Sequence, residues 1–308
     1  DKHSNLVSVK GDIRDSALME RVFDSHRPEG VFHCAAILAH EAESERFLWT
    51  SNVDGTQVVA ECSKKFGTSN LVFTSSNCLW GKPLGRPVTE DDEPAPVELY
   101  GRSKQEGEKI LDLYRGDLNV VMLRCPTIID AGRLGLLSIL FEFIQENRKV
   151  WTVGGGHNRY QFIYAQDLAD AALCGIRYGK SGVFNVGSEN VRTIREVYNY
   201  VIERAGSSSR VASLPRGLTL AAMKLAYAAK VSPLGPYHYK MIAEDFLFDL
   251  TRIKNSLGWK PTLTNEEMLF RAYQYYAANR NEIDRRQNVS AHRKSASMGA
   301  IRLLKWIS

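Results

Sequence analysis

The feature that most constrains the fold is a repeated alternation of short apolar segments with amphipathic helical segments over the first 126 residues. The short segments carry apolar residues in succession and do not alternate them with polar ones, which is typical of strands that are covered on both faces. Strands that alternate with helices predict a parallel, doubly wound α/β sheet. The strands expected here are Leu6–Val9, Gly30–His33, Leu71–Phe73 and Val120–Leu123. Between them we expect helices after a cap at Asp15 or Ser16, at 54–66 and around Tyr100.

Small or polar residues follow each expected strand. In an open α/β sheet the carboxyl ends of the strands form the crevice that binds ligands. We therefore expect the residues at these ends to line one cleft. They are Asp12, Ala35, Ala36, Ser75, Ser76 and Pro126.

Tyr100 and Lys104 are four residues apart, which places both side chains on one face of a helix. A phenol loses its proton near pH 10, and a neighbouring ammonium lowers that pKa. Lowering the pKa to about 7 takes roughly 4 kcal/mol. One lysine does not supply that much, so we expect a second positive charge such as an oxidised nicotinamide ring. For an isolated pair, a solvated helix face remains the alternative.

The second half of the chain is less regular. Thr193 and Glu196 form a capping box, and Asp167 is placed to cap a helix over 168–178. Ser207–Ser209 reads as a short linker. Further helices are expected at 136–147, after Thr193, at 218–229 and at 266–278, and further strands at 149–153, within 159–167 and at 183–186.

Composition excludes several classes of protein. The net charge of +5 over 308 residues is too modest to indicate nucleic-acid binding. The five cysteines are scattered without metal-ligand spacing, so we expect no zinc site or disulfide framework and favour reduced thiols in the cytoplasm. No apolar run is long enough for a membrane span. The tail 284–308 is basic; we expect it to be flexible, with a surface-binding helix as the alternative.

An ordered series of motifs resembles the extended short-chain dehydrogenase/reductase family, of the NAD-dependent epimerase/dehydratase type. That family contains nucleotide-sugar epimerases, dehydratases and hydroxysteroid dehydrogenases. The resemblance extends from Val7 to about Ala278. The motifs are Gly11-Asp12-Ile13, His33-Cys34-Ala35-Ala36, Asn52-Val53-Asp54-Gly55-Thr56, Thr74-Ser75-Ser76, Tyr100-Gly101-Arg102-Ser103-Lys104, Arg124-Cys125-Pro126, and Arg159 to Ile163 leading to Asp167-Leu168-Ala169.

The resemblance implies a catalytic role for three residues. Tyr100, as phenolate, takes the proton from a substrate hydroxyl while hydride passes to NAD or NADP. Lys104 holds the cofactor ribose and lowers the pKa of Tyr100, and Ser76 orients the reacting oxygen.

The resemblance also implies binding roles. The expected cofactor-binding residues are Asp12, Ile13, Ala35, Ala36, Asn52, Ser75, Tyr100, Lys104 and Pro126, and the expected substrate-binding residues are Ser76, Asn77 and Arg159. Several of these assignments have an alternative. Ala35 and Ala36 could be small residues at a tight turn, and Ser76 could be a solvated or capping serine. Asp12 and Asn52 could each be a plain helix cap, and Arg159 could form a surface salt bridge.

Two departures from the family pattern matter. Sugar 4,6-dehydratases carry an Asp-Glu pair where this chain has Asn77-Cys78, which disfavours water elimination. No GxxGxxG loop precedes the first strand, and Gly154-Gly155-Gly156 comes too late to replace it. We therefore expect that a first β-α-β unit is missing before Asp1 and that the chain is a fragment of a longer enzyme.

The fold expected is thus a doubly wound parallel sheet, Rossmann-like and N-terminally incomplete, with a smaller C-terminal substrate-binding subdomain. Residues 1–126 and 160–187 are expected to bind the cofactor, and 127–159 and 188–283 the substrate. The leading function is an NAD(P)-dependent epimerase or dehydrogenase acting on a nucleotide sugar, in a homodimer formed by the helices near Gly55 and Tyr100. The alternatives are a 3β-hydroxysteroid- or flavonoid-reductase-like enzyme, suggested by the apolar segment 218–227, and a cofactor-deficient scaffold.

Overall fold

The computed structural model describes residues 5–38, 42–229, 242–283 and 285. The chain forms two compact units. The first unit comprises Asp1–Trp80, Glu93–Arg124 and Asp170–Phe184, and the second comprises Gly81–Asp92, Cys125–Ala169 and Asn185–Ser308. The division of the chain into cofactor-binding and substrate-binding parts stays a prediction.

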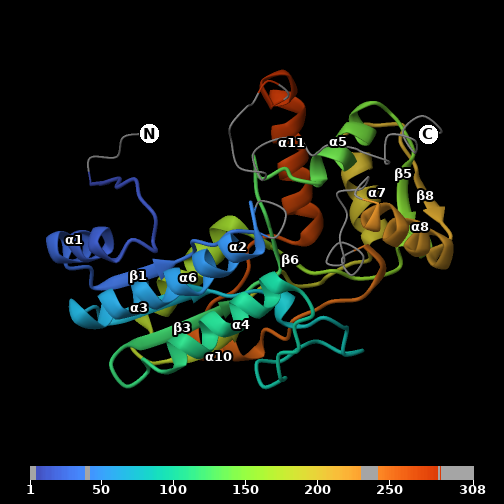
Figure 1. Ribbon diagram of the computed structural model, residues 1–308. Helices are drawn as coiled ribbons and strands as arrows, with labels where there is room; N and C mark the ends of the chain where they lie inside the picture. Colours follow the sequence, from blue (N-terminus) through green and yellow to red (C-terminus); the bar gives the residue numbers. More distant parts are fainter. Residues whose placement is uncertain (1–4, 39–41, 230–241, 284, 286–308) are drawn as a thin grey trace. The chain divides into compact units, whose positions relative to one another are not determined.

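A four-stranded sheet forms the centre of the first unit (Figure 1). Its order is β1 (Gly30–His33), β2 (Asn70–Thr74), β3 (Asn119–Arg124) and β7 (Gly182–Asn185). The pairs β1–β2 and β2–β3 are parallel, with Val31 opposite Leu71 and Leu71 opposite Val120. This confirms the parallel sheet expected from the alternation of strands and helices.

Both faces of this sheet are covered. On one face Leu71, Phe73 and Met122 form a buried core with Val59 of α3 (Asp54–Lys65). On the other face Val72 and Val121 lie directly against Gly175 of α6 (Ala165–Arg177). Successive strand residues thus point to opposite apolar layers, which explains why these strands are apolar throughout.

The other helices of the first unit are α1 (Ser16–His26), α2 (Glu45–Asn52) and α4 (Leu99–Asp112). The carboxylate of Asp15 accepts a hydrogen bond from the Leu18 amide at 3.0 Å, so Asp15 caps α1 as expected. The helix α2 was not expected from the sequence, and it is only eight residues long.

The strand expected at 6–9 is wrong. Residues 6–10 form no ladder with any described strand, and Leu6 and Val7 are 66% and 67% exposed. β1 is instead the edge strand of the sheet. A strand exists only through hydrogen bonds to a neighbour, so an apolar pattern alone does not create one.

The second unit contains two small parallel pairs, β4 (Thr127–Ile129) with β6 (Phe162–Tyr164) and β5 (Val150–Val153) with β8 (Val211–Leu214). β8 was not expected from the sequence. Helices α7 and α5 pack against α11. The helices of this unit are α5 (Leu137–Gln145), α7 (Ile194–Arg204), α8 (Arg216–Ala228), α10 (Thr251–Leu257) and α11 (Asn265–Ile283).

Two expectations about helix starts had different outcomes. The capping box of Thr193 and Glu196 is present at the start of α7. The cap expected at Asp167 is wrong, because α6 already begins at Ala165. The buried Asp167 carboxylate instead accepts hydrogen bonds from the Thr262 amide and hydroxyl, at 2.9 and 2.6 Å.

The expected basic tail lies outside the described residues, apart from Arg285. Over the part of the chain that the structure describes, no helix has both the length and the apolar character needed to cross a bilayer.

Candidate functional site

Tyr100 and Lys104 lie in the first two turns of α4, at the carboxyl end of β2. The Lys104 side chain is buried, with the residue only 3% exposed. Its ammonium donates a hydrogen bond to the main-chain oxygen of Thr74 at 2.7 Å and lies 4.6 Å from the centre of the Phe73 ring. Tyr100 is half-buried. The structure thus places a buried positive charge one helical turn from a partly accessible phenol.

Ser76 lies where β2 gives way to a short 3-10 helix, η1 (Asn77–Leu79). Its hydroxyl oxygen accepts a hydrogen bond from the Cys78 amide at 3.1 Å. Its hydroxyl proton has no acceptor among the described residues. Ser76 can therefore donate to an oxygen of a bound molecule while its position stays fixed.

Gly101 allows η1 and α4 to approach closely. A Cβ atom at this position would lie 2.3 Å from the main-chain oxygen of Cys78. Any other residue at 101 would therefore push Cys78 away from α4. Gly101 therefore allows η1, which follows Ser76, to pack against the start of α4.

Asn52 connects this helix to the segment that follows β1. Its amide group donates to the Ser103 hydroxyl and to the Ile37 oxygen, both at 3.0 Å, and its oxygen accepts from the Ile37 amide at 2.7 Å. Ser103 in turn donates to the main-chain oxygen of Tyr100 at 2.8 Å. The helix-cap interpretation of Asn52 is wrong, because Asn52 ends α2 and α3 has no side-chain cap.

His33 is a member of this site for which the sequence predicted no role, although it belongs to one of the motifs. It is 4% exposed, and its Nε2 lies 2.9 Å from the hydroxyl of Thr56. Burial, and then the charge of Lys104, lower the pKa of His33 to about 3. A neutral imidazole therefore lies beside the lysine at every ordinary pH. A single histidine at a strand end carries no sequence signal of this role.

Arg124 and Glu108 form a buried ion pair between β3 and α4. The guanidinium donates to the two carboxylate oxygens at 3.0 and 2.8 Å and lies 5.2 Å from the centre of the Trp80 ring. Both side chains are less than 10% exposed. Glu108 is four residues after Lys104, so this pair fixes the next turn of the same helix against the sheet.

Asp12 does not cap a helix, so that alternative is wrong; the cap of α1 is Asp15. The Arg14 guanidinium and amide bind the Asp12 carboxylate, with distances of 2.6 to 3.1 Å. These hydrogen bonds lower the pKa of Asp12. Arg14 also donates to the Thr50 hydroxyl at 2.8 Å, and the side chain of Ile13 lies against Gly55. The expected adenine-contacting pair is thus fixed against α2 and α3.

The remaining expected residues fall into two groups. Ala35, Ala36, Ser75 and Asn77 belong to the first unit; Ser75 and Asn77 are buried and Ala35 is exposed. Pro126 and Arg159 belong to the second unit. The Arg159 guanidinium lies 3.7 Å from the Asp245 carboxylate, with both side chains half exposed. The salt bridge considered for Arg159 is therefore present.

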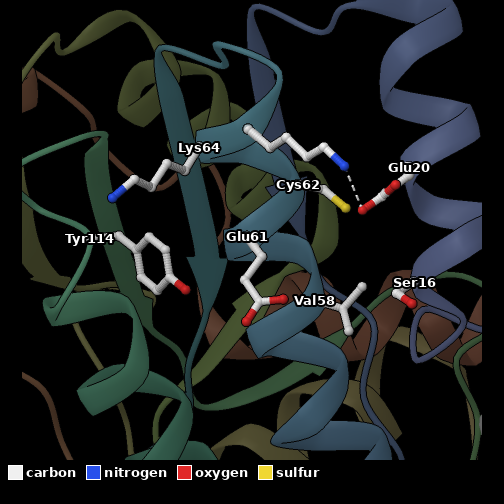
Figure 2. A pocket seen from close by; sticks show the side chains of 8 residues that line it. Ser16, Glu20, Val58, Glu61, Cys62, Lys64 and Tyr114 are labelled. Carbon is white, nitrogen blue, oxygen red and sulfur yellow. Dashed lines mark ion pairs between the residues drawn. The ribbon is translucent and has the colours of Figure 1, made fainter.

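A cavity of about 360 Å³ is lined by residues of α1 and α3 and by Tyr114, which follows α4 (Figure 2). Its lining includes Glu20, Lys65 and Tyr114 but none of the expected site residues. Tyr114 follows Tyr100 by 14 residues, which is about 20 Å along a helix. Both lysines of its wall form ion pairs, Lys65 with Glu20 and Lys64 with Asp117, each at 2.8 Å. Within the described ranges no cluster of His, Cys, Asp and Glu could hold a metal ion.

The geometry of the first unit fits the reactive end of a nicotinamide cofactor. The Lys104 ammonium can bind ribose hydroxyls, and the small side chain of the exposed Ala35 allows a flat ligand to approach the end of β1. The Ser76 hydroxyl retains a proton to donate.

A sequence profile of the NAD dependent epimerase/dehydratase family matches residues 2–187. The chain is 36% identical to the uncharacterized protein y4nG of Sinorhizobium fredii over 280 residues, 90% of this chain and 70% of that protein. It is 27% identical to a UDP-glucose 4-epimerase of Lacticaseibacillus casei over 234 residues, 67% of this chain and 70% of that protein.

Solved structures show the same fold. A UDP-glucose 4-epimerase of Thermotoga maritima, solved with UDP-glucose, has a TM-score of 0.74 at 24% identity and covers 90% of this chain and 86% of its own. The enzyme WbmG of Bordetella bronchiseptica, solved with NAD and UDP, has a TM-score of 0.71 at 23% identity and covers 88% and 79%. The Rossmann-like α/β fold expected from the sequence is thereby confirmed.

Proposed function

Because the chain belongs to the NAD dependent epimerase/dehydratase family, we propose that it is an epimerase that acts on a nucleotide sugar with Tyr100 as its acid and base. The sequence predicted an NAD-dependent enzyme, and the enzymes of this family are NAD-dependent. The observation that carries the proposal is the buried Lys104 ammonium, held on the Thr74 oxygen one turn from Tyr100.

Each of the three central side chains has one task in this reaction. Tyr100, as phenolate, takes the proton of a substrate hydroxyl and later returns it. Lys104 stabilises the phenolate by its charge, which acts strongly because water is excluded around it. Ser76 donates its hydroxyl proton to the reacting oxygen and so orients it. NAD, when bound, supplies the hydride acceptor that the chemistry requires.

Most of the residues that we assign to the cofactor belong to the first unit. We assign the cofactor ribose to Lys104 and Tyr100, and the adenine to Asp12 and Ile13. Four residues near the strand ends are assigned to the site where the cofactor comes close to the main chain: Ala35, Ala36, Asn52 and Ser75. Pro126 completes the set. Asp12 already accepts hydrogen bonds from Arg14, so it binds the adenine amine with a carboxylate whose position is fixed.

Epimerisation is favoured over dehydration. The positions after Ser76 carry Asn77 and Cys78, where sugar 4,6-dehydratases carry an Asp-Glu pair. Asn77, next to Ser76, is the other proposed substrate contact. Arg159 is the proposed contact for a substrate phosphate, and a phosphate would compete with Asp245 for its guanidinium.

The proposal also includes an oligomeric state and a cellular compartment. We place the enzyme in the cytoplasm as a homodimer formed by α3 and α4, whose last turn is followed by the 80% exposed Leu113. Sedimentation measurements that find only monomers would reject the dimer.

The proposal is tested by a screen of substrates. The protein is incubated with NAD or NADP and with UDP-, GDP- or TDP-sugars, and the sugar products are identified by NMR. We expect one class of nucleotide sugar to be converted into its epimer. Turnover of steroid or aryl alcohols without binding of any nucleotide sugar would instead support the hydrophobic-alcohol alternative, for which the exposed Leu218 and Leu225 of α8 are the supporting observation.

A further inference from the structure

The imidazole of His33 lies at the end of β1, in contact with two other elements of the first unit and within the electrostatic reach of a third. Its Nε2 is 2.9 Å from the Thr56 hydroxyl of α3, and its ring centre is 5.4 Å from that of Phe73 in β2. The third neighbour is Lys104 of α4, the charged group that acts on it electrostatically.

The hydrogen bonds around Thr56 determine which nitrogen of His33 carries the proton. The Thr56 hydroxyl donates its single proton to the Asn52 main-chain oxygen at 2.7 Å. The same oxygen can therefore only accept from His33. His33 consequently carries its proton on Nε2. Because burial and Lys104 keep its pKa far below neutral, Nδ1 stays unprotonated.

Two chains of contacts connect this imidazole to the start of α4. The first passes through Phe73, whose ring contacts His33 and lies under the Lys104 ammonium at 4.6 Å. The second passes through Thr56 and Asn52 to Ser103, which donates to the Tyr100 main-chain oxygen at 2.8 Å. His33 thus contacts the first residue of each chain, Phe73 in one and Thr56 in the other.

We propose that His33 is a positioning residue for the turn of Tyr100 and Lys104. Its imidazole holds Phe73 and Thr56, and through them it sets the place of the lysine ammonium and of the tyrosine main chain. Its neutrality is part of the role, because a second buried cation beside Lys104 would repel the ammonium. The link to catalysis rests on the proposed function; the link to the ionisation of Tyr100 does not.

The test measures the titration of Tyr100 directly. Tyrosines labelled with ¹³C are followed by NMR as the pH is raised, and Tyr100 is assigned with the Tyr100→Phe variant. In His33→Gln, which loses the ring against Phe73, we expect the pKa of Tyr100 to rise by about half a unit or more, because a displaced ammonium stabilises the phenolate less. The acid limb of the kcat profile should move by the same amount.

A matched control separates positioning from general stability. Leu118 belongs to the core cluster that includes Phe73 but precedes β3, at the opposite end of the strands. Leu118→Ala should lower the melting temperature and leave the Tyr100 titration unchanged. If His33→Gln lowers the melting temperature and also leaves the titration unchanged, His33 is merely structural and the proposal fails.

A second pair of variants serves if His33→Gln does not fold. Thr56→Ser keeps the hydroxyl that accepts from His33, whereas Thr56→Val removes it. We expect the Tyr100 pKa to rise in Thr56→Val only; equal titrations in both overturn the proposal. Because the titration needs no substrate, it gives its answer even if no nucleotide sugar is turned over, an outcome that would reject the proposed function alone.

Discussion

Lys104 is a charged side chain in a nearly dry position. A buried ammonium costs several kcal/mol unless hydrogen bonds or opposite charge compensate it. The Thr74 oxygen and the face of the Phe73 ring each compensate part of that cost. His33 is neutral, so it adds no electrostatic repulsion to the cost. This arrangement preserves the charge of Lys104 for the phenol one turn away, which is what a catalytic pair requires.

The pH dependence of stability should report His33. Its pKa is about 3 in the folded protein, against 6.5 for an unperturbed histidine, so below pH 6.5 the unfolded state binds the proton first. Its contribution is therefore complete above pH 6.5 and is lost towards pH 3. Between pH 7 and pH 5 the loss is about 2 kcal/mol.

Urea unfolding at pH 7 and pH 5 checks this. The difference in unfolding free energy between the two pH values should be smaller in His33→Gln than in the wild type by that amount. Equal differences in the two proteins would mean that His33 titrates normally in the folded state.

Local sequence signals succeeded where an element is fixed by its own residues. Asp15 and the box of Thr193 and Glu196 cap helices, because the partners of each cap lie within three residues. Residues 6–9 failed for the opposite reason, since a strand depends on a neighbour that no local pattern reveals. The short α2 and β8 lacked enough periodicity to be found.

The attachment of α4 to β3 yields a prediction about stability. Glu108→Gln leaves the Arg124 guanidinium buried without its carboxylate, which should cost roughly 3–5 kcal/mol of unfolding free energy. The matched control is Glu106→Gln on the same helix, whose ion pair with Lys109 is exposed and should matter by less than about 1 kcal/mol. Urea unfolding of the two variants compares them; equal losses would show that the buried pair adds nothing.

For the molecule as a whole, the sequence predicted the parallel sheet of the first unit. It could not predict how the site is supported. The bond from Asn52 to Ser103 joins positions 51 residues apart, and the contact from His33 to Thr56 joins positions 23 apart. Such pairs depend on the final packing of helices on the sheet, and either partner alone is an ordinary polar residue.

We propose that Tyr100 is the acid and base of an NAD-dependent reaction. The most direct test mixes the protein with NAD and its nucleotide sugar and follows the absorbance of NADH through a single turnover, in the wild type and in Tyr100→Phe. Tyr114→Phe, in the turn beyond the far end of α4, is the control. We predict a loss of about 10²–10⁴-fold in Tyr100→Phe at saturating NAD, with Tyr114→Phe unaffected. NADH formation at the same rate in Tyr100→Phe and in the wild type would show that Tyr100 is not the acid and base.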